Sequence, residues 1–212
     1  MTSTITSISP SKHNPNMRDI YVDEKLAMTL PASIILQLKI QINCEWTSET
    51  NKRIASIAET EKARRLATSL ISRRMWGCDE LKTRLIKRGI EQSIATTTIE
   101  QLVEDGWLND LQYACALIRQ WIQKEPAGRR WLIHKLKVKK ISDNVAIEAI
   151  NVELEEISEQ ESANKFASLR LAKLDGVEKK VAARRVHAAL NRRGFETQVS
   201  VDAMRTAQSN SP

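Results

Sequence analysis

A basic segment centred on a leucine recurs three times along this chain, about fifty residues apart. The segments are "ELKTRLIKRGI" at 80–90, "WLIHKLKVKKI" at 131–141 and "RVHAALNRRGF" at 185–195. Aligned on Leu85, Leu136 and Leu190, they share apolar residues four positions before the leucine and five, nine and fourteen positions after it. A repeat of this length predicts tandem structural units, because one such unit cannot bury its apolar face alone.

Each repeat predicts three helices. Leu81 and Leu85 lie one turn apart on an apolar stripe, and Gly89 is placed to end their helix in a left-handed conformation. A second helix starts a few residues later. A third helix precedes each pair, at 60–75, 109–123 and roughly 161–174. Gly194 matches Gly89, but Lys140 takes that position in the middle repeat, so we expect its turn to close differently. The predicted fold class is all-α, with three three-helix repeats stacked in an elongated array.

The N-terminal part of the chain lacks this period. Residues 1–17 are rich in Ser, Thr, Asn and Pro, and we predict a disordered tail because little apolar surface is available to offset the entropy of ordering. The stretch "RDIYVDEKLAMTL" at 18–30 alternates polar and apolar residues around "DEK" and predicts a β-hairpin, after which Pro31 opens a helix at its first position. The predicted segments are a tail at 1–17, a hairpin and helix at 18–46, repeats at 47–107, 108–158 and 159–207, and a tail at 208–212.

Charge and cysteine content narrow the class of protein. The 212 residues carry 33 Lys and Arg against 26 Asp and Glu, which favours an anionic partner. Three cysteines without CxxC spacing support neither a disulfide framework nor a zinc site, so a reducing compartment fits. The sequence has no secretory signal pattern and no apolar run of eighteen residues, so we expect a cytoplasmic protein with no membrane partner.

The repeated basic zones have two interpretations. Cations near helix C-termini complement the helix dipole by about 0.3–1 kcal/mol each, and many are simply solvated. Alternatively, the zones form an extended surface for a polyanion or an acidic protein assembly. Residues 60–140 carry 17 basic against 9 acidic side chains, and 161–195 carry 9 against 3, whereas 141–160 carry six acids and no base. This segregation favours the second interpretation.

Other conspicuous residues favour structural roles. We expect Trp76, Trp107, Trp121 and Trp131 to pack in the core or between units, with base stacking as the alternative. The sequence contains no phosphate-binding glycine loop, nucleophile elbow or metal-ligand motif. An enzyme is therefore the least favoured class, and we expect no cofactor and no metal.

Several of these segments resemble the RecX family of regulators of the RecA recombinase. The resemblance covers about residues 60–207 and is carried by "DELKTRLIKRGI", "EDGWLNDLQYACALI" at 104–118, "GRRWLIHKL" at 128–136 and "ALNRRGF", in that order. The hairpin and helix at 18–42 look like the N-terminal extension of some members. Cys78, Asn109 and Lys140 depart from the family pattern.

The resemblance implies a curved, modular, monomeric helical protein that lies in the groove of the RecA filament on single-stranded DNA. It would limit filament extension, strand exchange, ATP hydrolysis and co-protease activity in recombination and the SOS response. Nine basic residues are expected to contact RecA acids or DNA phosphates: Arg73, Arg74, Lys87, Arg88, Arg129, Arg130, Lys137, Arg192 and Arg193. The alternative function is a direct DNA-binding module, such as a nucleoid or transcription factor, with strongly salt-dependent binding to bare DNA.

Overall fold

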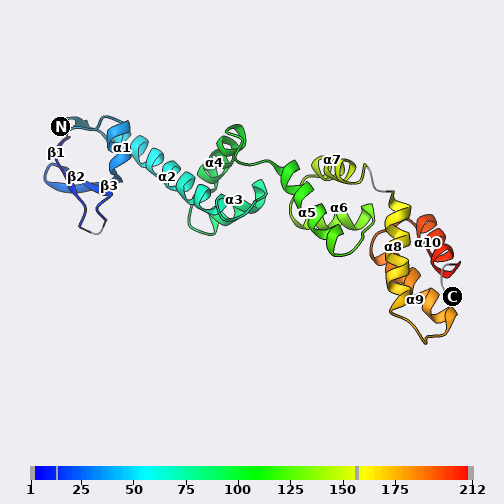
Figure 1. The fold of residues 1–212 in the computed structure, drawn as a ribbon. Helices are drawn as coiled ribbons and strands as arrows, with labels where there is room; N and C mark the ends of the chain where they lie inside the picture. The colour runs from blue at the N-terminus through cyan, green and yellow to red at the C-terminus, as the bar shows by residue number, and fades with distance from the viewer. Residues whose placement is uncertain (1–2, 13, 156–157, 210–212) are drawn as a thin grey trace. The chain divides into compact units, whose positions relative to one another are not determined.

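A computed structural model describes residues 3–12, 14–155 and 158–209 (Figure 1). Backbone contacts divide the chain into two compact units, one formed by Met1–Leu70 and Leu85–Thr98 and the other by Ile71–Arg84 and Ile99–Pro212. The first unit contains the strands, and the second contains most of the helices. Among the described helices, none combines the length and the apolar character that crossing a membrane requires.

The first unit begins with a four-stranded antiparallel sheet in the order β3-β2-β1-β4. The strands are β1 (Ser3–Pro10), β2 (Met17–Val22), β3 (Lys25–Pro31) and β4 (Glu45–Trp46). The predicted hairpin is confirmed, since β2 and β3 pair from Met17 to Val22 around a turn at Asp23 and Glu24. Both turn residues have positive φ, 47° and 66°, as the right-handed twist of a two-residue hairpin requires.

The predicted disorder of residues 1–17 is wrong for β1. This strand pairs with β2 on one side and β4 on the other, so its neighbours satisfy its backbone donors and acceptors. Its Ile5 is only 1% exposed and shares a core with Ile20, Leu30 and Trp46. The composition of this segment predicted disorder. The strand is ordered because Ile5 is buried and because β2 and β4 pair with it. Residues 1, 2 and 13 of the predicted tail, like residues 210–212 of the other one, lie outside the described residues.

Two helices complete the core of the first unit (Figure 1). Helix α1 (Ala32–Gln37) has Pro31 as its N-cap rather than its first residue, and it is shorter than the predicted helix. Helix α2 (Ser48–Ile71) contributes Ile54 to the apolar cluster that also contains Ile34 of α1. The Arg65 guanidinium donates a 2.7 Å hydrogen bond to the Ser33 hydroxyl, which joins the two helices.

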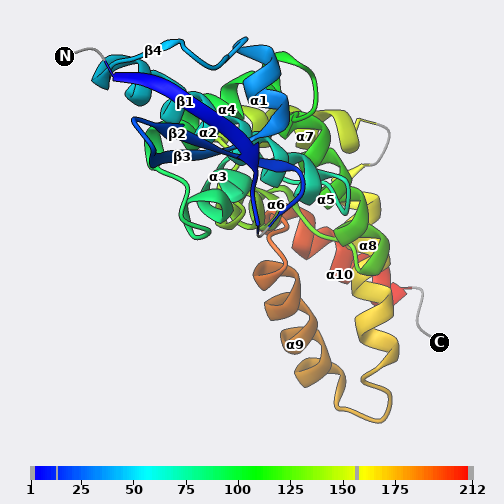
Figure 2. The ribbon, with the colours of Figure 1, turned by 90° about the vertical axis from the view of Figure 1, so that its left-hand side faces the viewer.

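The predicted helical character of the remaining chain is confirmed. The helices are α3 (Cys78–Ile86), α4 (Gln92–Glu104), α5 (Asp110–Lys124), α6 (Arg129–Val138), α7 (Asp143–Glu153), α8 (Glu159–Ala172), α9 (Lys179–Arg192) and α10 (Thr197–Ser209). In the second unit, α5, α6 and α7 enclose one apolar core, and α8, α9 and α10 enclose another. Figure 2 shows α8 and α9 as neighbouring helices joined by a loop at their lower ends.

Residues that align in the three repeats have the same degree of burial. Leu85, Leu136 and Leu190 have no exposed surface, and the residues four positions earlier are at most 1% exposed. The residues five and fourteen positions later are also buried in all three segments. Equal burial at equal spacing is what a tandem repeat requires, while the repeat borders at 107 and 158 stay a prediction.

One buried position differs chemically between the repeats. Ala95, Ala146 and Ser200 align, and each is at most 1% exposed. In the described part of the chain the Ser200 hydroxyl has no hydrogen-bond partner. We expect Ser200→Ala to raise the free energy of unfolding by about 1 kcal/mol, because a buried unpaired hydroxyl is removed without creating a cavity.

Urea denaturation measures this gain, and Ser168→Ala is the control. Ser168 is an exposed residue of α8, so its replacement reports the helix propensity of alanine alone. A gain at Ser200 no larger than the gain at Ser168 would contradict the prediction.

The expectation that the turn at Lys140 closes differently is wrong. Gly89, Lys140 and Gly194 all have positive φ, at 86°, 62° and 81°. In each turn, the amide of the following residue donates to the carbonyl of the aligned leucine, at 3.2, 3.1 and 3.3 Å. A lysine adopts this left-handed conformation because the strain amounts to only about 1–2 kcal/mol and the surrounding helices fix the turn.

Lys140→Gly should therefore raise the free energy of unfolding by about 1 kcal/mol by relieving this backbone strain. The lysine amine also donates a 3.3 Å hydrogen bond to the exposed Thr83 hydroxyl, which glycine loses. Lys140→Ala separates the two effects, because it removes the amine and keeps the strain. Chemical denaturation of both variants tests the prediction, which fails if alanine stabilises the protein as much as glycine does.

Candidate interaction surface

Seven of the nine predicted contact residues are exposed, and two are partly buried. Five of the exposed residues are Arg73 after α2, Lys87 and Arg88 after α3, Lys137 on α6 and Arg192 at the end of α9. Such positions leave the cationic groups accessible to a partner. The exposed Arg74 and Arg130 and the partly buried Arg129 and Arg193 donate hydrogen bonds within the protein.

Arg193 joins the end of α9 to the loop before α6. Its guanidinium donates to the carbonyl oxygens of Glu125 at 2.7 Å and Pro126 at 2.8 Å. The amide of Gly128 donates in turn to the Arg193 carbonyl at 3.0 Å. The side chain of Arg193 is only 16% exposed, so its main role within the chain is to hold α6 against the turn between α9 and α10.

The charge of Arg193 is partly compensated in this joint. Burial lowers the pKa of Arg193, the Glu125 carboxylate 3.8 Å away opposes that shift, and nearby Arg170 adds to it. Arginine remains protonated in proteins, so the joint keeps a buried positive charge. Arg170 also forms a 2.6 Å ion pair with Glu125, so this carboxylate interacts with both Arg170 and Arg193.

Trp131 of α6 lies at the centre of the same joint. Arg193 stacks 3.9 Å from the centre of its ring, and the Lys135 ammonium lies 5.2 Å from it. Trp121 packs edge-on against it, with ring centres 5.7 Å apart. These contacts agree with the packing role expected for Trp121 and Trp131. The face of the Trp131 indole ring attracts the cationic groups of Arg193 and Lys135.

Arg129 and Arg130 connect the start of α6 to two other elements. The Arg129 guanidinium donates to the side-chain oxygen of Asn151 on α7, and Arg130 donates to the Phe195 carbonyl. The structure thus brings together the start of α6 and the end of α9, which the sequence treats as parts of different repeats. Sequence reasoning missed Glu125 and Asn151, because a single polar residue in a helix gives no signal of its distant partner.

A second hydrogen-bonded network connects α3 to α5. The Arg74 guanidinium donates to one carboxylate oxygen of Glu80 at 2.9 Å, and the Tyr113 hydroxyl donates to the other at 2.9 Å. Burial opposes ionisation of Glu80, but the hydrogen bonds from Arg74 and Tyr113 outweigh it and lower the pKa of Glu80. Arg74 also stacks 3.4 Å from the ring centre of Trp76, so its side chain is held from two sides.

This network predicts a loss of stability at alkaline pH. Burial and the hydrogen bond to Glu80 raise the pKa of Tyr113 to about 12, and burial with the nearby Asp110 raises the pKa of Cys78 to about 12. Both groups deprotonate more readily in the unfolded chain, near their ordinary values of 10.0 and 9.0, so stability falls as pH rises from about 9 to 12.

Urea denaturation midpoints between pH 8 and 11 test this prediction. A double variant, Tyr113→Phe with Cys78→Ser, contains neither group and should show a shallower decline. Parallel declines in the two proteins would assign the alkaline instability to other residues.

The prediction that Trp107 packs in the core or between units is wrong. Its side chain is 57% exposed, at the connection between α4 and α5, while the neighbouring Leu108 is 4% exposed. The glycine before it, Gly106, has a φ of 75°, and this turn directs Leu108 rather than Trp107 into the core. The sequence "DGW" gives no indication of which of the two apolar residues is buried.

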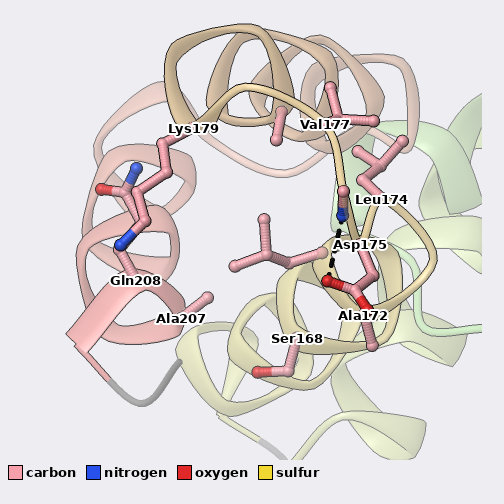
Figure 3. A pocket seen from close by; sticks show the side chains of 11 residues that line it. Ser168, Ala172, Leu174, Asp175, Val177, Lys179, Ala207 and Gln208 are labelled. Atoms are coloured by element: carbon pink, nitrogen blue, oxygen red, sulfur yellow. Dashed lines mark hydrogen bonds between the residues drawn. The ribbon is translucent and has the colours of Figure 1, made fainter. Parts of the chain in front are cut away.

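A pocket of about 730 Å³ lies in the C-terminal helices (Figure 3). Leu171 and Ala172 of α8, the loop at 174–177 and the start of α9 line it, with Ala207 and Gln208 of α10 opposite. In the loop, the Gly176 amide donates to the Asp175 carboxylate at 3.0 Å. Most of the lining is apolar, and Asp175 and Lys179 offset each other in charge, so the pocket does not select an anionic partner.

No cluster of three His, Cys, Asp or Glu side chains suited to a metal ion occurs within residues 3–12, 14–155 and 158–209. Glu80, Asp110 and Cys78, which lie near one another, are instead engaged with protein groups. The Asp110 carboxylate accepts the Cys78 amide at 2.8 Å, and Glu80 accepts Tyr113 and Arg74.

The chain is similar to several regulatory proteins named RecX. It is 26% identical over 195 residues to that of Bacillus licheniformis, covering 92% of this chain and 74% of the relative. It is 29% identical over 164 residues to that of Clostridium perfringens strain 13, covering 77% and 76%. For Bacillus subtilis the identity is 26% over 200 residues, covering 94% and 75%. No protein-family model matches the chain.

Two crystal structures share the fold. A structure of regulatory protein RecX superposes with a TM-score of 0.77 at 18% identity, covering 98% of this chain and 100% of that one. The structure of RecX from Lactobacillus salivarius gives a TM-score of 0.63 at 17% identity, covering 71% and 97%. The relatives that span most of the sequence and the shared fold lead to one conclusion: over most of its length the chain is similar to the regulatory proteins named RecX, and it has their fold.

Proposed function

We propose that this protein regulates the RecA recombinase, mainly as an inhibitor, by binding in the groove of the RecA filament on single-stranded DNA. Bound there, it limits filament extension, and with it strand exchange, ATP hydrolysis and co-protease activity. Similarity to regulatory proteins named RecX supports a regulatory role. The basic surface described above supports an acidic or nucleic-acid partner.

The observation that carries the proposal is the exposure of cations within three residues after the aligned leucine of each repeat. Lys87 and Arg88 follow α3, Lys137 lies near the end of α6, and Arg192 ends α9. Helix α9 contains no acidic residue, and its Lys180 and Arg184 are also exposed. A surface of this kind attracts acidic side chains or phosphates.

A filament offers its binding sites at regular intervals, and a protein with repeated cations is suited to several of them at once. Each exposed ion pair contributes only about 0–1 kcal/mol. Linked contacts raise the overall affinity because the second and third contacts form at a high effective concentration. We therefore propose that Lys87, Arg88, Lys137 and Arg192, with Arg73, are the residues that contact the filament, while the other four predicted arginines position the helices.

The test follows RecA-dependent ATP hydrolysis on single-stranded DNA while this protein is added at substoichiometric amounts. We expect hydrolysis to decline over minutes as filaments shorten, and electron microscopy of the same samples measures filament length. Unchanged hydrolysis and filament length would reject the proposal. Binding to naked DNA is measured in parallel, and tighter binding to naked DNA than to filaments would favour a direct DNA-binding module instead.

A further inference from the structure

A smaller pocket of about 340 Å³ lies in the second unit, between residues 71–76 and residues 106–112. Its lining comprises Ile71, Ser72, Arg73, Arg74, Met75, Trp76, Gly106, Trp107, Asn109 and Gln112. The pocket is distinct from the helix ends that carry Lys137 and Arg192. It is at the lower end of the size range of ligand pockets, about 300–1,000 Å³, which fits a single small group.

The pocket displays aromatic and cationic groups without any acid. Trp107 is 57% exposed and Met75 is 50% exposed, which is unusual for side chains of this size. Arg73 is exposed, whereas Arg74 is held by Glu80 and by stacking on Trp76. Glu80 compensates the charge of Arg74, so Arg73 gives the lining its net positive charge, and no acid is among the lining residues.

Two amide side chains add hydrogen-bonding groups to the rim. Asn109 caps α5, and its side-chain oxygen accepts the Gln112 amide at 3.0 Å. That bond fixes the orientation of the Asn109 side chain and leaves its amino group as a donor. Gln112 is exposed and provides both a donor and an acceptor.

We propose that this pocket binds one nucleotide of single-stranded DNA, with the base stacked on Trp107 and the adjoining phosphate paired with Arg73. An exposed indole ring stacks on any base, an arginine pairs with phosphate, and amides contact base edges. A helix of a partner protein needs an extended apolar groove, whereas this small pocket offers two indole rings, Ile71 and Met75 between polar groups. The positive lining favours the nucleotide.

This inference rests on the proposed function for its setting, because RecA filaments form on single-stranded DNA. It adds to that function a contact with the DNA itself, at bases that the filament leaves accessible or at the filament end. The protein would then recognise the strand by its bases as well as by its charge.

The test measures binding of the full-length protein to fluorescent oligothymidine and to an abasic oligonucleotide of equal length, by anisotropy at several salt concentrations. The two strands have the same number of phosphates, so a difference in affinity reports the bases. We expect the protein to prefer oligothymidine and Trp107→Ala to weaken that binding about 5- to 100-fold, with affinity for the abasic strand unchanged. Trp107→Phe should retain most of the preference, since phenylalanine also stacks.

Two further variants locate the effect. Arg73→Gln should weaken binding to both strands. It should also reduce the slope of log affinity against log salt concentration by about one, because one fewer counterion is released. Leu169→Ala is the matched control, because Leu169 is 51% exposed on α8 and lies away from the pocket. Circular dichroism checks that each variant retains its helices.

Equal preference for oligothymidine in wild type and Trp107→Ala, or no preference in wild type, would overturn the inference. So would a Trp107→Ala protein that binds DNA normally but no longer slows RecA, because this result assigns the pocket to a protein partner. The DNA measurements contain no RecA, so their failure leaves the proposed regulation of RecA standing. Conversely, failure of RecA regulation leaves the DNA measurements interpretable.

Discussion

Replacing Gly128 with alanine should lower the free energy of unfolding by about 3 kcal/mol, because the added methyl group overlaps backbone atoms that cannot move independently. A Cβ at Gly128 would lie 2.3 Å from the Gly194 carbonyl oxygen and 2.4 Å from its carbon. The same substitution displaces the hydrogen bond from the Gly128 amide to Arg193. Relief requires α6 to separate from the turn between α9 and α10.

Gly77→Ala is the matched control, since Gly77 lies 51 residues earlier at the aligned position. Its Cβ would lie 3.0 Å from the ring of Tyr113, a side chain that can shift slightly. We expect a loss of about 1 kcal/mol there. Urea denaturation monitored by circular dichroism measures both variants, and equal losses would show that the joint at Gly128 is looser than the structure indicates.

The second large effect is expected on the inhibition of RecA-dependent ATP hydrolysis by this protein. Reversing Lys137 and Arg192 together to glutamate should raise the concentration of protein that halves RecA-dependent ATP hydrolysis by about 100-fold, at roughly 1.4 kcal/mol for each reversed charge. Both side chains are exposed, so the reversal should leave the stability of the fold nearly unchanged. Titrating the variant into filaments on single-stranded DNA measures this shift.

The control for this experiment is a double reversal of Lys25 and Lys52, which are exposed residues of β3 and α2. It changes the net charge of the protein by the same amount but lies in the other unit. Equal weakening by the two double variants would mean that total charge, and no particular surface, governs the effect. Unchanged inhibition by the first variant would reject Lys137 and Arg192 as contacts.

Arg129 and Arg130 are less suitable for such a test, although their sequence position suggests a basic contact site. Each donates a hydrogen bond within the protein, to Asn151 and to Phe195. Their removal would alter the packing of α6 as well as any contact with a partner. Stability measurements on such variants are needed before their effect on RecA is interpreted.

The helical part of the fold was predictable because its signals are local. The spacing of Leu81 and Leu85, or of Leu132 and Leu136, places both members on one face of a helix, and each of these residues is completely buried. A glycine or a lysine then ends the helix within one turn. The strand at 3–10 was not predictable in this way, since its order comes from pairing with β2 and β4.

In the candidate site, too, some features follow from local sequence and others depend on contacts between distant residues. The sequence located the cations, and it distinguished basic segments from the acidic stretch at 141–160. It did not distinguish Arg192, which is exposed, from Arg193, which donates to carbonyl oxygens 67 and 68 residues earlier in the chain. Nor did it separate Trp107, on the surface, from Trp131, which packs beneath Arg193.

The sequence by itself determined the helical period, the positions of the turns after α3, α6 and α9, and the sign of the charge that the protein presents. These properties depend on residues within a few positions of each other, so the pattern of side chains is sufficient to specify them. Only the tertiary structure decided which arginines are available to a partner and which tryptophan faces solvent. Those outcomes depend on hydrogen bonds and packing between residues far apart in the chain, which no local pattern records.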